Sequence, residues 1–517
     1  MSRQYDTIIF DLGDVLFHWD ASTITALPKL TLRHMMHSTL WYNFERGLLS
    51  SNEAYKLLAE EHKTTPELVR LALDQAQETL TPDPKMSDLI LKLKATSPLE
   101  KPGHPKIRVL GLTNITKEHF ESIQASHPHF PWHMFDRIFT SFGTGMRKPN
   151  LNIYQHVLDQ TGIDPARTIF LDDRPENICS ARFFGIRGEI VGRLPPERSK
   201  VIKLVTNLLV PQEVSLRAMV AHLGMPELVN LCWPPLPSNG AIDTAASDTI
   251  SNPDSGVGQD EPSSKEDSSA ATSSFPEGLW YYFATSPVFS TKNFPRDSDT
   301  TSLAYLTVGD EYISSGGMLP VAEAMDAIAR NVNEDGILLT YFDQSRPMID
   351  SGVCADVLRF FNRFSGIRVE DDGRLKPTVE FVVNTLANRA YIHGTRYYTP
   401  EAFLYFAAHL WSESKETSPG LWARLDKHIR PALIERLRVA DPVEKNALAL
   451  AMRVYACQVV GIEKELLRSD FEELLSMQED DGGWPAGCLC FFARSGDRIG
   501  NRGLTTALVW KILKEMS

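Results

Sequence analysis

The stretch TIIFDLGDVL, residues 7–16, sets four residues of a short strand-like run directly before an aspartate, Asp11. Three further short apolar runs follow it along the chain, namely IRVLGLTN (107–114), TIFLDD (168–173) and GEIVG (188–192). Amphipathic segments with helical periodicity lie between these runs. Because such alternation is typical of a parallel sheet covered by helices on both faces, the first part of the chain is predicted to be an α/β domain.

The rest of the chain divides by composition. Helical periodicity over residues about 18–100 interrupts the strand pattern, as an inserted helical cap would. The segment 238–274 carries seven acidic residues and one basic residue, with almost no large apolar side chain, so it cannot bury enough surface to offset its ordering entropy. We therefore predict an α/β domain at 1–235, a flexible acidic linker at 236–275 and an all-α domain at 276–517.

Overall composition excludes some classes of partner. The net charge of −13 argues against nucleic acid, which requires a surplus of Lys and Arg. The chain contains no run of about 18 apolar residues and no apolar signal core near its start, which predicts a cytoplasmic protein without stable membrane insertion. The six scattered cysteines are read as reduced thiols, in keeping with that compartment.

Polar side chains stand at the ends of three predicted strands. The carboxyl ends of strands in an open α/β sheet line one crevice, so these side chains can converge although they are far apart in sequence. A carboxylate nucleophile, a hydroxyl and an amide, a lysine, and a carboxylate pair for Mg²⁺ would suffice for phosphoryl transfer. The residues are Asp11, Thr113, Asn114, Asp172 and Asp173 at the strand ends, and Lys148 in GMRKPN, residues 145–150, between two of these strands. The alternative is that each acid merely caps a strand or helix.

In this order the segments resemble the haloacid-dehalogenase-like (HAD) superfamily, over roughly residues 5–215. The resemblance implies that Asp11 is a nucleophile that forms an aspartyl-phosphate. It also implies phosphate binding by Thr113, Asn114 and Lys148, and a Mg²⁺ cofactor at Asp11, Gly13, Asp172, Asp173 and Glu176. Glu176 is equally consistent with an acidic residue that stabilises a helix N-terminus.

Gly13 departs from the HAD pattern. HAD phosphatases usually carry a second aspartate at this position, two residues after the nucleophile, as the general acid and base. Without that acid, expulsion of an alkoxide from a phosphate monoester is slower by a factor of about 10² to 10⁴. A diphosphate has a better leaving group, so Gly13 points to a diphosphate substrate, with Asp14 or water as possible substitutes for the missing acid.

A second candidate site begins at DSDTT, residues 297–301. Taken by itself, this motif is a plausible helix start in which an aspartate caps the helix. Two features add a functional interpretation. QEDDGGW, residues 478–484, matches the Q-x-x-x-G-x-W pattern that recurs in α-barrel triterpene and diterpene cyclases. The predicted all-α domain is also rich in aromatic residues, which could line a dry pocket around a carbocation.

With these features DSDTT resembles the D-x-D-D motif of class II terpene cyclases, in a D-x-D-T-T variant. The whole chain resembles the fused drimane-type sesquiterpene synthases, which make albicanol or drimenol. The resemblance implies that farnesyl diphosphate is the substrate, that Asp299 donates a proton to its distal alkene, and that Asp297, Thr300 and Thr301 form the hydrogen-bonding shell of Asp299. A carboxyl group can remain protonated at neutral pH when burial and a like-charged neighbour raise its pKa.

Three hypotheses follow. The first is a bifunctional enzyme that cyclises farnesyl diphosphate to an albicanyl or drimenyl diphosphate and then removes phosphate with Mg²⁺. The second keeps the cyclase but has the HAD-like part stop at the monophosphate or serve only as a scaffold. The third is a HAD phosphatase joined to a helical module that binds a partner protein.

Overall fold

The computed structural model describes residues 4–95, 106–209, 278–283, 294–308, 313, 318–438, 446–491 and 498–516. These described residues belong to one compact unit. The predicted linker at 236–275 and Cys232 lie outside the described residues. The other five cysteines are free and buried, as expected of reduced thiols.

The first part of the chain contains a five-stranded sheet of order β5-β4-β1-β6-β7, and every neighbouring pair is parallel. The strands are β1 (Thr7–Phe10), β4 (Arg108–Thr113), β5 (Arg137–Thr140), β6 (Thr168–Asp172) and β7 (Arg187–Ile190). The predicted parallel α/β fold is therefore confirmed. Strand β5 was not predicted, because its four residues RIFT begin with an exposed arginine and bury only their last two side chains.

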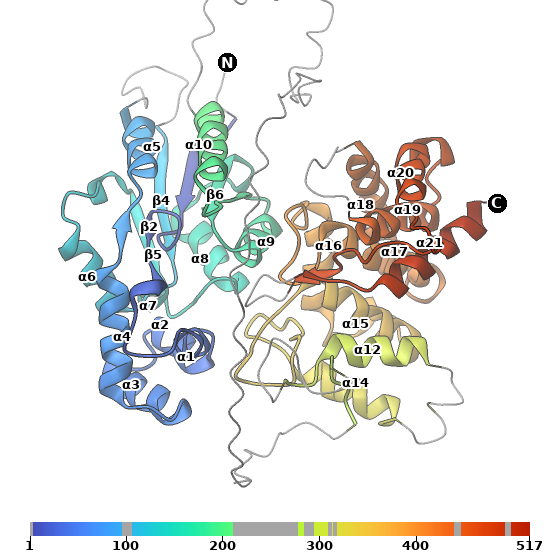
Figure 1. Ribbon diagram of the computed structural model, residues 1–517, viewed down its shortest axis with the longest axis horizontal. Helices are drawn as coiled ribbons and strands as arrows, with labels where there is room; N and C mark the ends of the chain where they lie inside the picture. Colours follow the sequence, from blue (N-terminus) through green and yellow to red (C-terminus); the bar gives the residue numbers. More distant parts are fainter. Residues whose placement is uncertain are drawn as a thin grey trace, which may run out of the picture. The chain divides into compact units, whose positions relative to one another are not determined.

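Helices pack on both faces of this sheet (Figure 1). Strand β1 alternates between two cores: Ile8 and Phe10 pack on one side with α5 (Pro84–Ala95) and α10 (Pro195–Leu209), while Ile9 packs on the other. The second core includes side chains of α8 (Leu151–Thr161) and α9 (Pro175–Phe183). Burial on both faces explains why the strands read as continuous apolar runs.

A helical insert follows β1 and has a core of its own. It contains α1 (Lys29–Met35), α2 (Thr39–Glu45), α3 (Ser51–Glu61) and α4 (Pro66–Glu78), and the antiparallel pair β2 (Phe17–His18) and β3 (Thr81–Pro82) stands where the chain enters and leaves it. The predicted cap at about 18–100 is therefore shorter in the structure, because α5 packs with the sheet. Helices α6 (Lys117–Ser126) and α7 (Ser141–Thr144) complete this part.

The second part is mostly helical, as predicted, and its described residues include one short antiparallel pair, β8 (Cys490–Phe491) and β9 (Arg498–Ile499). Its helices share a large apolar core. They are α12 (Ser298–Thr307), α14 (Val321–Arg330), α15 (Ser351–Phe364), α16 (Lys376–Ala387), α17 (Pro400–Thr417), α18 (Pro419–Arg438), α19 (Ala447–Val460), α20 (Lys464–Ser476) and α21 (Arg502–Met516). None of the helices in the described ranges is both long enough and apolar enough to cross a bilayer.

Candidate active sites

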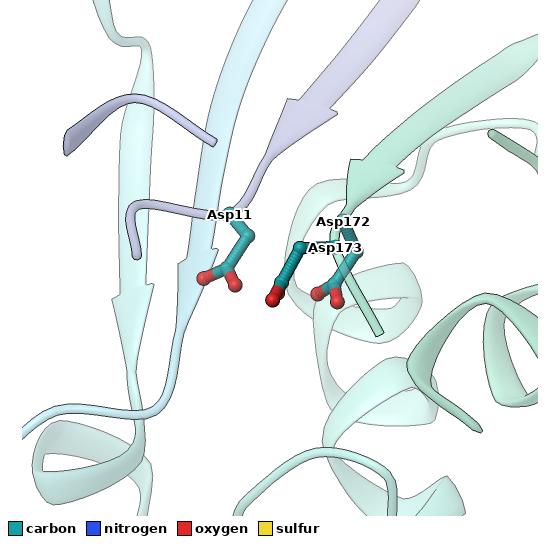
Figure 2. A group of neighbouring side chains, drawn as sticks. All are labelled: Asp11, Asp172 and Asp173. Carbon is teal, nitrogen blue, oxygen red and sulfur yellow. The ribbon is translucent and has the colours of Figure 1, made fainter. Parts of the chain in front are cut away.

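The pairing of β1 with β6 brings the first two carboxylates together. Phe10 lies opposite Leu171, so the next residues, Asp11 and Asp172, reach the same edge of the sheet side by side. Asp173 follows directly, and ligand oxygens of all three carboxylates lie within 4.8 Å of one another. Figure 2 shows the three side chains gathered beyond the tips of their strands. The predicted convergence of these acids is thus present in the fold.

Lys148 bridges two of these carboxylates. Its buried Nζ lies 2.9 Å from Asp11 Oδ1 and 2.6 Å from Asp172 Oδ2. Burial lowers the pKa of Lys148, but the charges of Asp11 and Asp172 outweigh burial and raise it. Asn114 donates to the Lys148 carbonyl and accepts from the Lys148 N–H, each at 2.9 Å, so it fixes the lysine backbone. Thr113 ends β4 and lines a cavity that Asp11, Lys148 and Asp173 also line, which we call the carboxylate cavity.

The carboxylate cluster carries a surplus of negative charge. Burial and the charge of Asp172 raise the pKa of Asp173 to about 8; burial raises that of Asp11 to about 6 although Lys148 opposes it. Asp172 is occupied by Lys148 and by the Asn177 amide, which donates to both of its oxygens at 2.9 and 3.1 Å. Carboxylate oxygens in this arrangement fit Mg²⁺, which prefers oxygen ligands. Asp11 and Asp173 would hold the ion.

Gly13 leaves open space at the wall of this cavity. A Cβ built at Gly13 meets no heavy atom within 4 Å, so no neighbouring atom excludes a Cβ there. Asp14, one of the two possible substitutes for the missing acid, is buried and forms an ion pair with Arg193.

Glu176 lies apart from the cluster of ligand oxygens. It stands in the first turn of α9, where its Oε1 accepts hydrogen bonds from Arg396 at 2.8 Å and from Arg174 at 3.4 Å. Burial opposes ionisation of Glu176, but the two arginines outweigh burial and lower its pKa to about 2. The structure thus places the predicted metal ligand in an ion pair at a helix N-terminus.

The DSDTT motif starts α12, and the capping interpretation holds for its first aspartate. Asp297 is the N-cap residue, and its carboxylate accepts from the Thr300 N–H at 2.6 Å and from the Thr300 hydroxyl at 2.9 Å. The Thr301 hydroxyl donates to the Asp297 carbonyl at 2.7 Å. Burial raises the pKa of Asp297 to about 7.

The side-chain hydrogen-bond partner of Asp299 is a residue that was not predicted, although Asp297 remains a charged neighbour. Asp299 Oδ2 accepts a hydrogen bond from the Tyr398 hydroxyl, whereas Thr300 and Thr301 bond to Asp297, so the expected hydrogen-bonding shell is corrected. Its buried Oδ1 has no hydrogen-bond partner among the described residues. Burial, followed by the charges of Asp356 and Asp297, raises the pKa of Asp299 well above its usual range. Asp299 is therefore a buried carboxyl group that tends to keep its proton.

Asp299 opens onto a cavity with aromatic walls. The ring of Tyr341 packs edge-on against Phe294 and Tyr397, at centroid separations of 5.6 and 6.1 Å. Such π-faces stabilise a cation that has no water around it. We call this space the aromatic cavity; the aromatic residues that line it are Tyr282, Phe294, Tyr341, Tyr397, Tyr398 and Phe491.

The QEDDGGW segment has a structural role. Gln478 donates to the Gly482 carbonyl at 2.9 Å, and Gly482 adopts a positive φ of 85° that suits glycine. Trp484 is buried, and its indole donates to the Leu474 carbonyl at 2.7 Å. These contacts fasten the end of α20. None of the three named residues is among those that line the aromatic cavity in the described part of the chain.

Two contributors were not singled out from the sequence. Tyr398 and Arg396 occupy one short segment, with Tyr398 bonded to the acid Asp299 and Arg396 to Glu176. The available signal was the run RYY, residues 396–398, an arginine beside two tyrosines in front of the helix start TPEA.

Both parts of the chain match known protein families. Residues 8–191 match the family described as haloacid dehalogenase-like hydrolase, and residues 263–364 match the sesquiterpene cyclase astC-like C-terminal domain. Drimenol cyclase drtB of Aspergillus calidoustus is 32% identical over 510 residues, which cover 98% of this chain and 87% of drtB. Sesquiterpene phosphatase astK of Aspergillus oryzae is 32% identical over 188 residues, 36% of this chain and 90% of astK. A HAD-like family hydrolase structure from Porphyromonas gingivalis matches 39% of this chain and 98% of its own, with 21% identity and a TM-score of 0.31.

The fold and the sequence matches define an enzyme in which a HAD-like hydrolase domain is fused to a sesquiterpene cyclase domain. The chain belongs to the family of drimenol cyclase drtB.

Proposed function

We propose that the chain cyclises farnesyl diphosphate to a drimane-type bicyclic diphosphate, albicanyl or drimenyl, and then removes phosphate from it. Residues 276–517 carry the cyclisation and residues 1–235 the dephosphorylation. The observation that carries this proposal is Asp299: a buried carboxyl group with one oxygen bonded to Tyr398 and the other unpaired among the described residues, beside an aromatic cavity.

Cyclisation begins with a proton transfer. The carboxyl group of Asp299 gives its proton to the distal alkene of the substrate, which leaves a carboxylate on Asp299 and a tertiary cation on the chain. The Tyr398 hydroxyl donates to Oδ2, so it stabilises the carboxylate that forms. The internal alkenes then attack in turn, two carbon–carbon bonds form, and loss of a proton beside the final cation ends the reaction. The diphosphate is retained.

Dephosphorylation takes place at the carboxylate cluster. The Asp11 carboxylate attacks the terminal phosphorus, the phosphorus–oxygen bond to the leaving phosphate breaks, and water later hydrolyses the aspartyl-phosphate. Lys148, Thr113 and the metal held by Asp11 and Asp173 would neutralise the phosphoryl oxygens. Mg²⁺ supplies charge neutralisation at this site. The similarity to drtB, a drimenol cyclase, and to astK, a sesquiterpene phosphatase, supports this pair of reactions.

Two variants test the proposal. Asp299→Asn should abolish cyclisation and leave phosphate release from farnesyl diphosphate, whereas Asp11→Asn should accumulate the bicyclic diphosphate. Asp326→Asn, which removes an exposed carboxylate that pairs with Arg374, serves as the matched control. Products are identified by mass spectrometry after incubation with farnesyl diphosphate and Mg²⁺. Formation of the bicyclic alcohol by both variants would refute the proposal.

Gly13 favours a second outcome for the phosphatase step. The first cleavage of a diphosphate expels a phosphate, which needs no proton, whereas the second expels an alkoxide, which does. Since position 13 carries no acid and Asp14 is bound to Arg193, this second candidate has the reaction stop after the first cleavage and leave the bicyclic monophosphate. Quantitation of alcohol against monophosphate in the wild-type reaction distinguishes the two outcomes.

A further inference from the structure

Three residues line both the aromatic cavity and the cavity that contains the carboxylate cluster: His37, Met348 and Arg396. Arg396 is the one with a fixed positive charge. It belongs to the run 396–398, whose last member bonds to Asp299. One short segment therefore reaches both the acid site and the carboxylate cavity.

Arg396 is buried and incompletely paired. Its side chain is 8% exposed, its guanidinium donates to Glu176 and forms a side-chain hydrogen bond with Tyr397, and it lies 5.8 Å from the centre of the Tyr397 ring. Its Nε is buried without a hydrogen-bond partner among the described residues. A buried donor without a partner is costly, so the arrangement leaves a place for an acceptor.

Two guanidinium groups meet at Glu176. Glu176 Oε1 is shared by Arg396 and Arg174, and the charge of Asp173 also acts on Arg174. Arg174 is 44% exposed on the side of the carboxylate cavity, and its guanidinium also approaches His37 Nε2 at 3.5 Å. A guanidinium pair suits the oxygens of a phosphate or diphosphate, which it can bind through parallel hydrogen bonds.

We propose that Arg396 and Arg174 form one diphosphate-binding site that serves both reactions. This inference rests on the proposed function. During cyclisation the site holds the diphosphate of the substrate while the hydrocarbon chain extends into the aromatic cavity toward Asp299. The same site then holds the diphosphate of the bicyclic product at the wall of the cavity that contains Asp11. Arg396 and Arg174 are thus positioning residues for both steps.

The test measures the two steps separately in the full-length chain. Cyclisation is followed in the Asp11→Asn background as bicyclic diphosphate formed, and dephosphorylation in the Asp299→Asn background as phosphate released from farnesyl diphosphate. Adding Arg396→Met to each background should raise KM for both reactions by about tenfold to hundredfold, because a charged hydrogen bond to the substrate is lost. Arg396→Lys, which keeps the positive charge, should raise KM by less. The control is Arg424→Met, which breaks a similar pair with Glu380 on neighbouring helices of the cyclase part.

A change in the KM of only one reaction, or of neither, contradicts the shared site while leaving the proposed function intact. Absence of the retained activity from either background contradicts the proposed function itself. If Arg396→Met does not fold, as judged by circular dichroism, the shared site is tested instead by measuring the inhibition constants of methylenediphosphonate for the two reactions of the wild type. A shared site predicts inhibition of both reactions with constants that agree within about threefold. Constants that differ by more than about tenfold, or inhibition of one reaction alone, would overturn it.

Discussion

Replacing Tyr398 by phenylalanine removes one hydroxyl group from the acid site and leaves the ring that packs against Phe406. The hydroxyl donates to Asp299 Oδ2, so it stabilises the carboxylate more than the neutral acid and lowers the pKa of Asp299, against the larger effect of burial. Its removal therefore makes Asp299 a weaker acid. A hydrogen bond to a charged group contributes about 1.5–3 kcal/mol, which corresponds to a decrease in kcat of roughly tenfold to 150-fold.

The assay follows cyclisation in the Asp11→Asn background, in which the bicyclic diphosphate is not consumed. Since the hydroxyl acts on the carboxylate formed during proton transfer, kcat should fall while KM for farnesyl diphosphate stays within about twofold. The control is Tyr405→Phe, a hydroxyl deletion in α17 at a ring that packs on Phe406 and His409. An unchanged kcat, or a rise in KM alone, would refute the assignment of Tyr398 as the partner of the acid.

Three further predictions concern Asp297, Gly13 and Trp484. Burial raises the pKa of Asp297 to about 7, so the contribution of its protonated form to stability is complete below about pH 4 and is lost as pH rises through 7. Asp297→Asn keeps a capping acceptor, so the free energy of unfolding of this variant should rise by up to a few kcal/mol relative to wild type between pH 5 and pH 8, as measured by urea titration. A difference between variant and wild type that does not change with pH would contradict this. Gly13→Asp, for which there is space, should raise phosphate release from a prenyl monophosphate by at least about tenfold without changing cyclisation, and a decrease would count against the missing general acid. Trp484→Ala should lower the free energy of unfolding by about 3–5 kcal/mol, and loss of kcat from protein that is still folded would show a catalytic role instead.

Much of the fold could be predicted because it depends on local patterns. Strand β1 lies between two apolar cores, so its apolar run has to be continuous, and the sheet places the residue that follows it at a crevice. The end of the cap was missed for a physical reason. Helix α5 has the same amphipathic period as α3 and α4, and only its packing on the sheet separates it from them.

The candidate sites show a similar division. Asp11 and Asp172 could be proposed from strand ends, because the register of β1 with β6 brings them together. Lys148 was proposed from the segment GMRKPN, and the fold brings it to both carboxylates from the loop before α8. Tyr398 and Arg396 depend on contacts across about 100 and 220 residues of sequence, respectively, and no periodicity reports such contacts. Residues within one helical turn of Asp299 were expected to support it, but at the start of α12 the Thr300 hydroxyl donates to the Asp297 carboxylate and the Thr301 hydroxyl to the Asp297 carbonyl.

The most direct test of the central claim is the fate of the proton that starts the cyclisation. Wild-type protein equilibrated in D₂O is incubated with farnesyl diphosphate, and the bicyclic product is examined by mass spectrometry and NMR. If Asp299 protonates the distal alkene, the product carries one deuterium, on the ring carbon next to the gem-dimethyl carbon, and the Asp299→Asn variant forms no such product. A bicyclic product without deuterium at that carbon would contradict the account.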